Sequence, residues 1–258
     1  MFVPGIPKIV HQIWIGGKPL PPQWSAYAEQ IQVLHPGWIY RLWTDADLEH
    51  LWEIDPFGLK GIYGLWENVG YQADILRLLI LWYYGGMYLD TDCEVVRPLD
   101  SLCEGHDAIV GATFPGEPYP QVLVQNAVIA AAPRHPWIAL TLRTMRDELP
   151  TLDFPALRQD KINILDLTGP GRLSATLVEY MNTHGFHDPS VTVIPSPLLF
   201  PTGPNWLPTP ERFPGVYLIH HWVYSWDKDI GEVKSVGEVK SVGAAASPSY
   251  YPVYPAAK

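Results

Sequence analysis

The sequence predicts an α/β fold, with a central mixed sheet and helices on both faces. Residues 7–17 form a β-branched strand that ends in two glycines and precedes a helix, the order with which α/β nucleotide-binding folds begin. Residues 71–94 then indicate a buried helix, a glycine turn and a short strand. Of the 258 residues 47% are hydrophobic and only 17% are charged, enough apolar material for one large domain or two small ones.

The acidic composition argues against nucleic acid as a partner. Seventeen basic and 27 acidic residues give a net charge of −10, and no basic block offsets it. Cys93 and Cys103 are too few for a disulfide scaffold or a zinc site. No apolar run is long enough to cross a bilayer, and the first residues do not resemble a signal peptide. We therefore expect a chain without a membrane span, located in the cytoplasm.

The N-terminal elements follow from the local pattern. Residues 21–34 predict an amphipathic helix opened by proline, and residues 38–43 predict a second strand. Asp45 follows that strand and is interpreted as the N-cap of a helix over 47–52. The G-x-G-x-x-G spacing and the P-loop lysine are both absent.

The stretch from residue 73 to residue 84 predicts a helix that is covered on most of its surface, because nearly every position is apolar. Its charges are Asp74 and Arg77, which lie three apart on one helix face and could pair with each other or with a ligand. Gly85 and Gly86 then end the helix.

Two acids follow the short strand over residues 87–89. Residues two apart share one side of a strand, so alternation predicts that Asp90 and Asp92 stand side by side at its end. Carboxylates in such a place are costly unless a cation neutralises them, and a hard divalent ion is the natural candidate. The alternative is a solvated turn.

The second half continues the alternation of strands and helices. Asn126 opens a strand over 125–130, where its amide could bond sugar hydroxyls. The segment 168–171 precedes a helix and either offers amides to an anion or is a plain turn. His220 and His221 follow a strand that begins at residue 216, and neighbours alternate, so they cannot both face inward. The other predicted elements are strands over 95–99, 108–113 and 191–194, helices over 135–148 and 172–183, and proline-rich loops over 115–120 and 195–214.

These motifs resemble the DXD sugar-transferases of glycosyltransferase family 32, whose pattern is S/A-D-x-x-R followed by G-G-x-Y-x-D-x-D. The matching residues are Ala73, Asp74, Arg77, Gly85, Gly86, Tyr88, Asp90 and Asp92. The resemblance covers residues 6–227 and includes yeast-type initiating mannosyltransferases, bacterial capsule enzymes and the large clostridial glucosylating toxins. It implies the GT-A type nucleotide-sugar-binding fold.

The resemblance also implies roles for single residues. Asp92 ligates a metal ion directly, while Asp90 holds the donor ribose and a metal-bound water. A C-terminal histidine joins the metal, with His221 favoured over His220. An imidazole among oxygen ligands suits Mn²⁺ better than Mg²⁺, which stays an alternative.

The donor contacts implied by the resemblance come from both halves of the chain. Asp74 and Arg77 reach the sugar or the phosphate. Trp14 stacks on the nucleobase, or else lies in the core, and Asp45 is a minor candidate near the base or ribose. The remaining donor contacts are Ile13, Tyr88 and Asn126.

The function implied is transfer of a hexose from a UDP- or GDP-sugar to a glycan or other hydroxyl acceptor, with retention of anomeric configuration by analogy. Two alternatives stay open: an inactive sugar- or nucleotide-binding module, and a metal-dependent phosphoryl or nucleotidyl transferase. Residues 1–230 are expected to form the catalytic domain, and residues 231–258, with a duplicated six-residue unit, a flexible or β-ribbon tail. A Golgi lumenal location applies if an N-terminal anchor has been removed.

Overall fold

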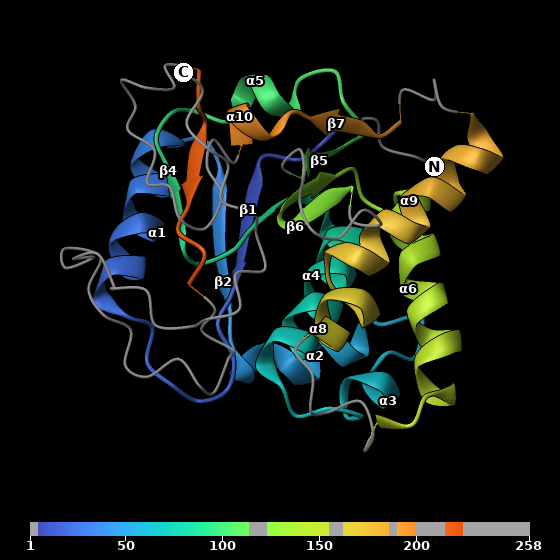
Figure 1. The fold of residues 1–258 in the computed structure, drawn as a ribbon. Helices are drawn as coiled ribbons and strands as arrows, with labels where there is room; N and C mark the ends of the chain where they lie inside the picture. The colour runs from blue at the N-terminus through green and yellow to red at the C-terminus, as the bar shows by residue number, and fades with distance from the viewer. Residues whose placement is uncertain (1–4, 114–122, 155–161, 186–189, 200–214, 224–258) are drawn as a thin grey trace, which may run out of the picture.

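The computed structural model describes residues 5–113, 123–154, 162–185, 190–199 and 215–223. It is a mixed α/β structure built on a six-stranded sheet with the order β2-β1-β3-β6-β5-β7, beside a two-stranded sheet of β4 and β8 (Figure 1). The strands are β1 (Ile9–Ile13), β2 (Ile39–Trp43), β3 (Gly86–Leu89), β4 (Cys93–Val95), β5 (Ala108–Ala112), β6 (Val124–Ala131), β7 (Thr192–Ile194) and β8 (Leu218–His220).

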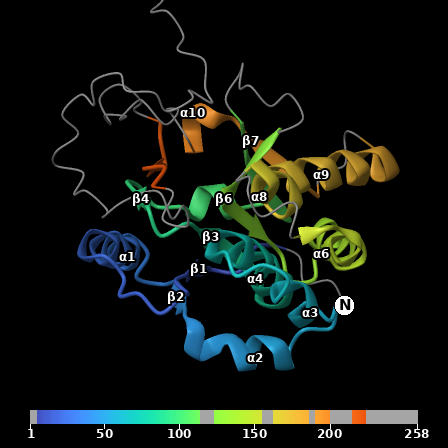
Figure 2. The same cartoon turned by 60° about the horizontal axis from the view of Figure 1, so that its bottom comes forward.

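Helices cover both faces of the sheet, as predicted. Figure 2 shows α1 on one side of the strands and α6 and α9 on the other. The described helices are α1 (Pro22–Leu34), α2 (Leu48–Glu53), α3 (Lys60–Tyr63), α4 (Val69–Tyr84), α5 (Asp100–Cys103), α6 (Pro136–Glu148), α8 (Ile162–Leu167), α9 (Pro170–His184) and α10 (Ser196–Leu199), with 3₁₀ turns at Asp45–Asp47 and Leu149–Thr151. None of them is long and apolar enough to cross a bilayer.

Alternation along the central strands divides the core into two clusters. On β3, Tyr88 belongs to the cluster under α4, α6 and α9. Its neighbours Met87 and Leu89 belong to the cluster under α1 and the β4–β8 pair. Because both faces of β3 are covered, all four of its residues are buried. This explains why the strand reads as an apolar run without polar alternation.

The strand directions bring three chain segments to one edge of the sheet. β1 runs parallel to β2 and β3, and β3 runs antiparallel to β6. The carboxyl ends of β1 and β3 therefore meet the start of β6. This is the edge at which the sequence places Asp90 and Asn126.

The glycine turn fixes how β3 leaves α4. Asn68 caps the start of the helix by accepting N–H bonds from Gly70 and Tyr71. At the other end Gly85 and Gly86 have φ values of +64° and +96°. A Cβ at Gly86 would lie 2.7 Å from the Ile9 carbonyl oxygen, so β3 can approach β1 only with glycine there.

Most predicted elements are confirmed, with shorter ends at the strands. The strand expected over 7–17 spans Ile9–Ile13, and the one expected from residue 216 spans Leu218–His220. The strand predicted over 95–99 is wrong, since β4 ends at Val95 and α5 follows from Asp100. The loop predicted over 195–214 is wrong at its start, because Ser196–Leu199 form α10. The rest of that loop from residue 200, the loop at 115–120 and the tail at 231–258 lie outside the described residues.

Candidate functional site

The two acids lie in a turn that directly follows β3. The Asp90 N–H donates to the Ala127 carbonyl oxygen at 2.9 Å, and the Cys93 N–H returns to the Asp90 carbonyl oxygen at 3.0 Å. Both acids follow the carboxyl end of the strand, as predicted, but the strand ends at Leu89, so the turn and not strand alternation sets their directions. The alternative of a solvated turn does not hold either, since only 5% of Asp92 is exposed.

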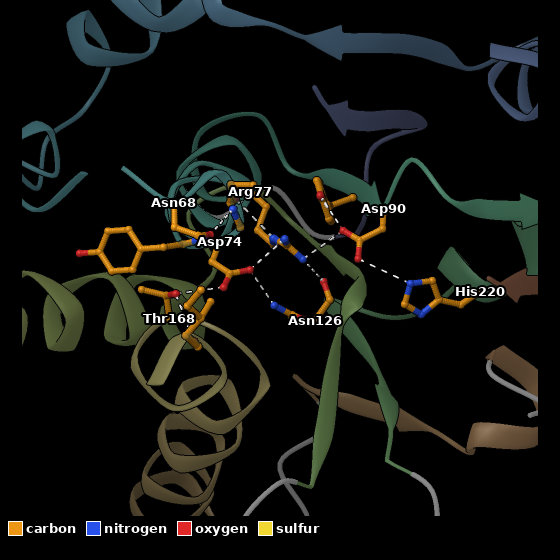
Figure 3. A network of polar contacts seen from close by, with 12 residues as sticks. Asn68, Asp74, Arg77, Asp90, Asn126, Thr168 and His220 are labelled. Atoms are coloured by element: carbon orange, nitrogen blue, oxygen red, sulfur yellow. Dashed lines mark hydrogen bonds and ion pairs between the residues drawn. The ribbon is translucent and has the colours of Figure 1, made fainter. Parts of the chain in front are cut away.

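A buried network of charges joins α4 to this turn (Figure 3). The Arg77 guanidinium lies 2.8 Å from Asp74 Oδ1 and 3.2 Å from Asp90 Oδ1. Asp74 also accepts hydrogen bonds from the Asn126 amide at 2.8 Å and from the Thr168 hydroxyl at 2.9 Å. Arg77 donates to the backbone carbonyl oxygen of Asn126 at 2.7 Å. The predicted pairing of Asp74 with Arg77 is present, and Arg77 links it to Asp90.

The electrostatics of the network follow from its burial. Burial raises the pKa of Asp74 to about 6, although Arg77 and the Thr168 hydrogen bond work against the increase. Burial alone would lower the pKa of Arg77, but Tyr88, Asp90 and Asp74 together raise it. The guanidinium therefore stays charged. It also lies over the Tyr88 ring, 4.5 Å from its centroid, while the Tyr88 hydroxyl donates to Asp90 Oδ1 at 2.8 Å.

His220 is the histidine that faces the acids. Its Nε2 lies 3.2 Å from Asp92 Oδ1 and 3.8 Å from Asp90 Oδ2. The other Asp92 oxygen accepts the Val223 N–H at 2.7 Å. Burial works against charge on both side chains. The attraction between the two side chains outweighs the effect of burial, so the pKa of His220 is raised and the pKa of Asp92 is lowered.

His221 points to the opposite side, toward α1. Its ring stacks on Tyr27 at 5.2 Å between centroids. Its Nε2 lies 3.0 Å from both the Tyr27 hydroxyl and Glu94 Oε2. The expectation that the two histidines face opposite ways is met, but the preference for His221 beside the acids is wrong. β8 ends at His220 and pairs that residue with Cys93, directly after the acidic turn.

The side chains around Asp92 form a donor set that suits a divalent ion. Asp92, Cys93 and His220 each offer one ligand atom, and these atoms all lie within 4.8 Å of one another. The nearby Asp90 carboxylate is 26% exposed. Oxygen and imidazole donors are the ligands that divalent first-row metals take in proteins, so these residues fit such an ion.

The N-terminal candidates have mainly structural contacts. The Ile13 side chain is 6% exposed in the core, so only its backbone could meet a donor. Trp14 is half-buried, donates to the Lys18 carbonyl oxygen at 2.6 Å and lies edge-on to Trp24. The Asp45 carboxylate accepts the N–H groups of Gly16 and Gly17 at 3.0–3.1 Å.

Two local interpretations need correction. Asp45 is not a helix N-cap; Thr44 and Asp47 form the capping box. The Thr168 and Gly169 N–H groups are not free for an anion, because both donate to the Ile164 carbonyl oxygen. The Thr168 hydroxyl is what reaches the site.

Sequence reasoning missed a second support for Asp90. The Gln12 amide donates to the Asp90 carbonyl oxygen at 3.1 Å, and the Tyr40 hydroxyl donates to Gln12 Oε1 at 2.7 Å. Gln12 is fully buried. A glutamine inside an apolar strand was the available signal, because a buried amide needs partners.

Comparison with known proteins identifies the family. Residues 21–108 match a family model described as a glycosyltransferase sugar-binding region containing a DXD motif. The chain belongs to the DXD-containing glycosyltransferases. Inositol phosphoceramide mannosyltransferase 1 of Schizosaccharomyces pombe is 27% identical over 210 residues, covering 78% of this chain and 59% of that protein. Mannosyl phosphorylinositol ceramide synthase SUR1 of Saccharomyces cerevisiae is 31% identical over 184 residues, covering 68% of this chain and 42% of that protein.

The fold of this family member is shared with a solved glycosyltransferase. The PaToxG glycosyltransferase superposes with a TM-score of 0.54 at 23% identity, covering 70% of this chain and 72% of that one. The likeness is one of fold, and it confirms the expected GT-A type arrangement. The chain spans about half the length of the two yeast relatives.

Proposed function

We propose that this chain transfers a hexose from a nucleotide diphosphate sugar to a hydroxyl acceptor. The observation that carries the proposal is the convergence of Asp90, Asp92 and His220 at the end of β3, beside a buried Asp74–Arg77 pair. A cluster of titratable side chains that burial and mutual charge perturb is typical of a functional site, and here it lies at the end of a buried strand. The two yeast relatives are named a mannosyltransferase and a mannosyl phosphorylinositol ceramide synthase, which supports hexose transfer with mannose as the first sugar to test.

Asp92 and His220, with Asp90 beside them, are the residues that would hold a divalent ion, for which we propose Mn²⁺. Such an ion supplies positive charge to the diphosphate that leaves as the anomeric bond breaks. The Val223 N–H holds one Asp92 oxygen in place, which fixes the direction of the other. Retention of configuration is proposed by family analogy.

Arg77, which is paired with Asp74, orients Asp90. Neither Arg77 nor Asp74 exposes much surface to a donor. Their side chains are 7% and 5% exposed, whereas the Asp90 carboxylate is 26% exposed. Arg77 and the Tyr88 hydroxyl both hold Asp90 Oδ1, so Oδ2 is the oxygen left to face a ligand. We propose that Asp90 Oδ2 meets the donor ribose or a metal-bound water.

The proposal is tested with UDP- and GDP-hexoses, with and without Mn²⁺, by measuring melting temperature and donor hydrolysis. A donor bound at 100 times its Kd stabilises the folded state by about 2.7 kcal/mol, so the true donor should raise the melting temperature only when Mn²⁺ is present. Asp92→Asn should stay folded and lose both responses. Hydrolysis separates an enzyme from an inactive binding module. A chain that no nucleotide sugar stabilises with Mn²⁺ would contradict the proposal.

A further inference from the structure

Cys93 lies on the same side as the candidate metal ligands. In the antiparallel β4–β8 pair, Cys93 is directly opposite His220. Directly opposite residues of an antiparallel pair present their side chains on one face. Cys93 is fully buried, and its sulfur lies within 4.8 Å of the ligand atoms of Asp92 and His220.

The separations suit a tetrahedral ion bound by nitrogen, oxygen and sulfur. In tetrahedral geometry, Zn²⁺ bonds of about 2.0–2.3 Å place two ligand atoms roughly 3.3–3.8 Å apart. His220 Nε2 and Asp92 Oδ1 are 3.2 Å apart, and the Cys93 sulfur lies within 4.8 Å of both atoms. The second Asp92 oxygen is held by the Val223 N–H, an outer contact of the kind that orients metal ligands.

We propose that Asp92, Cys93 and His220 form a site for a thiophilic divalent ion of the Zn²⁺ class. The inference rests on the proposed metal role of Asp92 and His220 and adds the thiolate that Mn²⁺ does not require. A sulfur–metal bond forms and the thiol proton passes to solvent, with no change of oxidation state.

Binding of Zn²⁺ at this site would inhibit transfer. The thiolate ligand comes from the buried β4–β8 pair, whereas the partly exposed Asp90 carboxylate, 3.8 Å from His220 Nε2, is not one of the three clustered ligand residues. An ion held by Asp92, Cys93 and His220 is not bound by Asp90, beside which the donor is proposed to bind. Zn²⁺ therefore displaces Mn²⁺ and does not replace its function.

The test is a Co²⁺ titration of the full chain that is monitored by its near-ultraviolet absorption spectrum. A cobalt–thiolate bond gives a sulfur-to-metal charge-transfer band in the near ultraviolet. Cys103→Ser is the matched control, because Cys103 is also a buried free thiol and the chain has two cysteines. We expect the band in the wild type and in Cys103→Ser, its loss in Cys93→Ser, and its removal by added Zn²⁺. The Zn²⁺ affinity of Cys93→Ser should fall by more than the roughly 10- to 100-fold that loss of an outer contact costs.

The outcomes decide the proposal even if Cys93→Ser does not fold. Cys93 is the one cysteine left in Cys103→Ser, so a cobalt–thiolate band in that variant comes from Cys93. A wild type that binds Co²⁺ without the band, or a Cys93→Ser variant that keeps it, would overturn the inference. Mn²⁺-dependent stabilisation by a nucleotide sugar, seen together with no thiolate band, would leave the proposed transferase intact and remove this site alone.

Discussion

At the scale of single residues, the site depends on the alternation of charge through Asp74, Arg77 and Asp90. Each carboxylate lies within 3.2 Å of the same guanidinium. Loss of Arg77 would leave two buried or half-buried acids without their cation, a change that typically costs about 3–5 kcal/mol. Loss of the Asp74 charge leaves a balanced Arg77–Asp90 pair. The two ends of the network are therefore not equivalent.

The free energy of unfolding of Asp74→Asn, relative to that of the wild type, should increase as the pH rises from 4 to 7. The folded-state pKa of Asp74 is raised to about 6 by burial, so the folded chain holds this proton where the unfolded chain has released it. The wild type loses up to about 3 kcal/mol over this range, and a neutral amide does not. Urea unfolding of both proteins at pH 4, 5, 6 and 7 measures the difference. A difference that is constant with pH would show that Asp74 titrates normally.

The two histidines should give different phenotypes. His220→Ala should weaken Mn²⁺ binding and donor hydrolysis together, with partial recovery at high Mn²⁺, because His220 faces Asp92. His221→Ala should lower the free energy of unfolding by about 1–3 kcal/mol without such recovery, because it loses Glu94 and the Tyr27 stack. Mn²⁺ titrations of activity and urea unfolding separate the two effects. Recovery at His221 alone would restore the preference drawn from the sequence.

At the scale of elements, the glycine turn between α4 and β3 sets the position of both acids. His11 on β1 is buried, and its Nε2 donates to the Gly85 carbonyl oxygen at 2.8 Å while the Trp43 indole donates to its Nδ1. Burial lowers the pKa of His11 to about 4, so the ring is neutral and its two nitrogens keep these different roles. The turn is therefore tied to the central strand as well as to the helix.

Gly86→Ala should destabilise the protein far more than Gly58→Ala. Both positions have positive φ values, +96° and +75°, so each alanine costs about 1–3 kcal/mol of backbone strain. Only Gly86 also faces a backbone atom, the Ile9 carbonyl oxygen, at 2.7 Å from the added carbon, and such overpacking adds about 1–3 kcal/mol. Urea unfolding measures both variants. If both variants lost the same free energy of unfolding, β1 and β3 would be able to move apart at Gly86 without an energetic cost.

At the scale of the whole molecule, the sequence predicts what is local. An apolar run ended by two glycines is enough to predict α4 and β3, and a spacing of three predicts the Asp74–Arg77 pair. It does not predict contacts between distant segments. Thr168 reaches Asp74 across 94 positions, and three-residue strands carry too little pattern to predict that Cys93 pairs with His220. For the same reason the sequence did not indicate that His220, and not His221, lies beside Asp92.

The last prediction concerns where the folded domain ends. β8 pairs with β4, and its Leu218 and Ile219 are buried. A chain ending at residue 214 should therefore lose more than about 3 kcal/mol, since burial of one such side chain contributes about 1.5–3 kcal/mol. It should also lose the Mn²⁺ response, because His220 and the Val223 N–H are the contacts of Asp92. A chain ending at residue 230 should match the full chain within about 0.5 kcal/mol and keep the response. Urea unfolding and the nucleotide-sugar melting assay compare the three lengths. If the chain ending at residue 230 unfolds like the one ending at residue 214, residues 231–258 belong to the catalytic domain, and the proposed boundary is wrong.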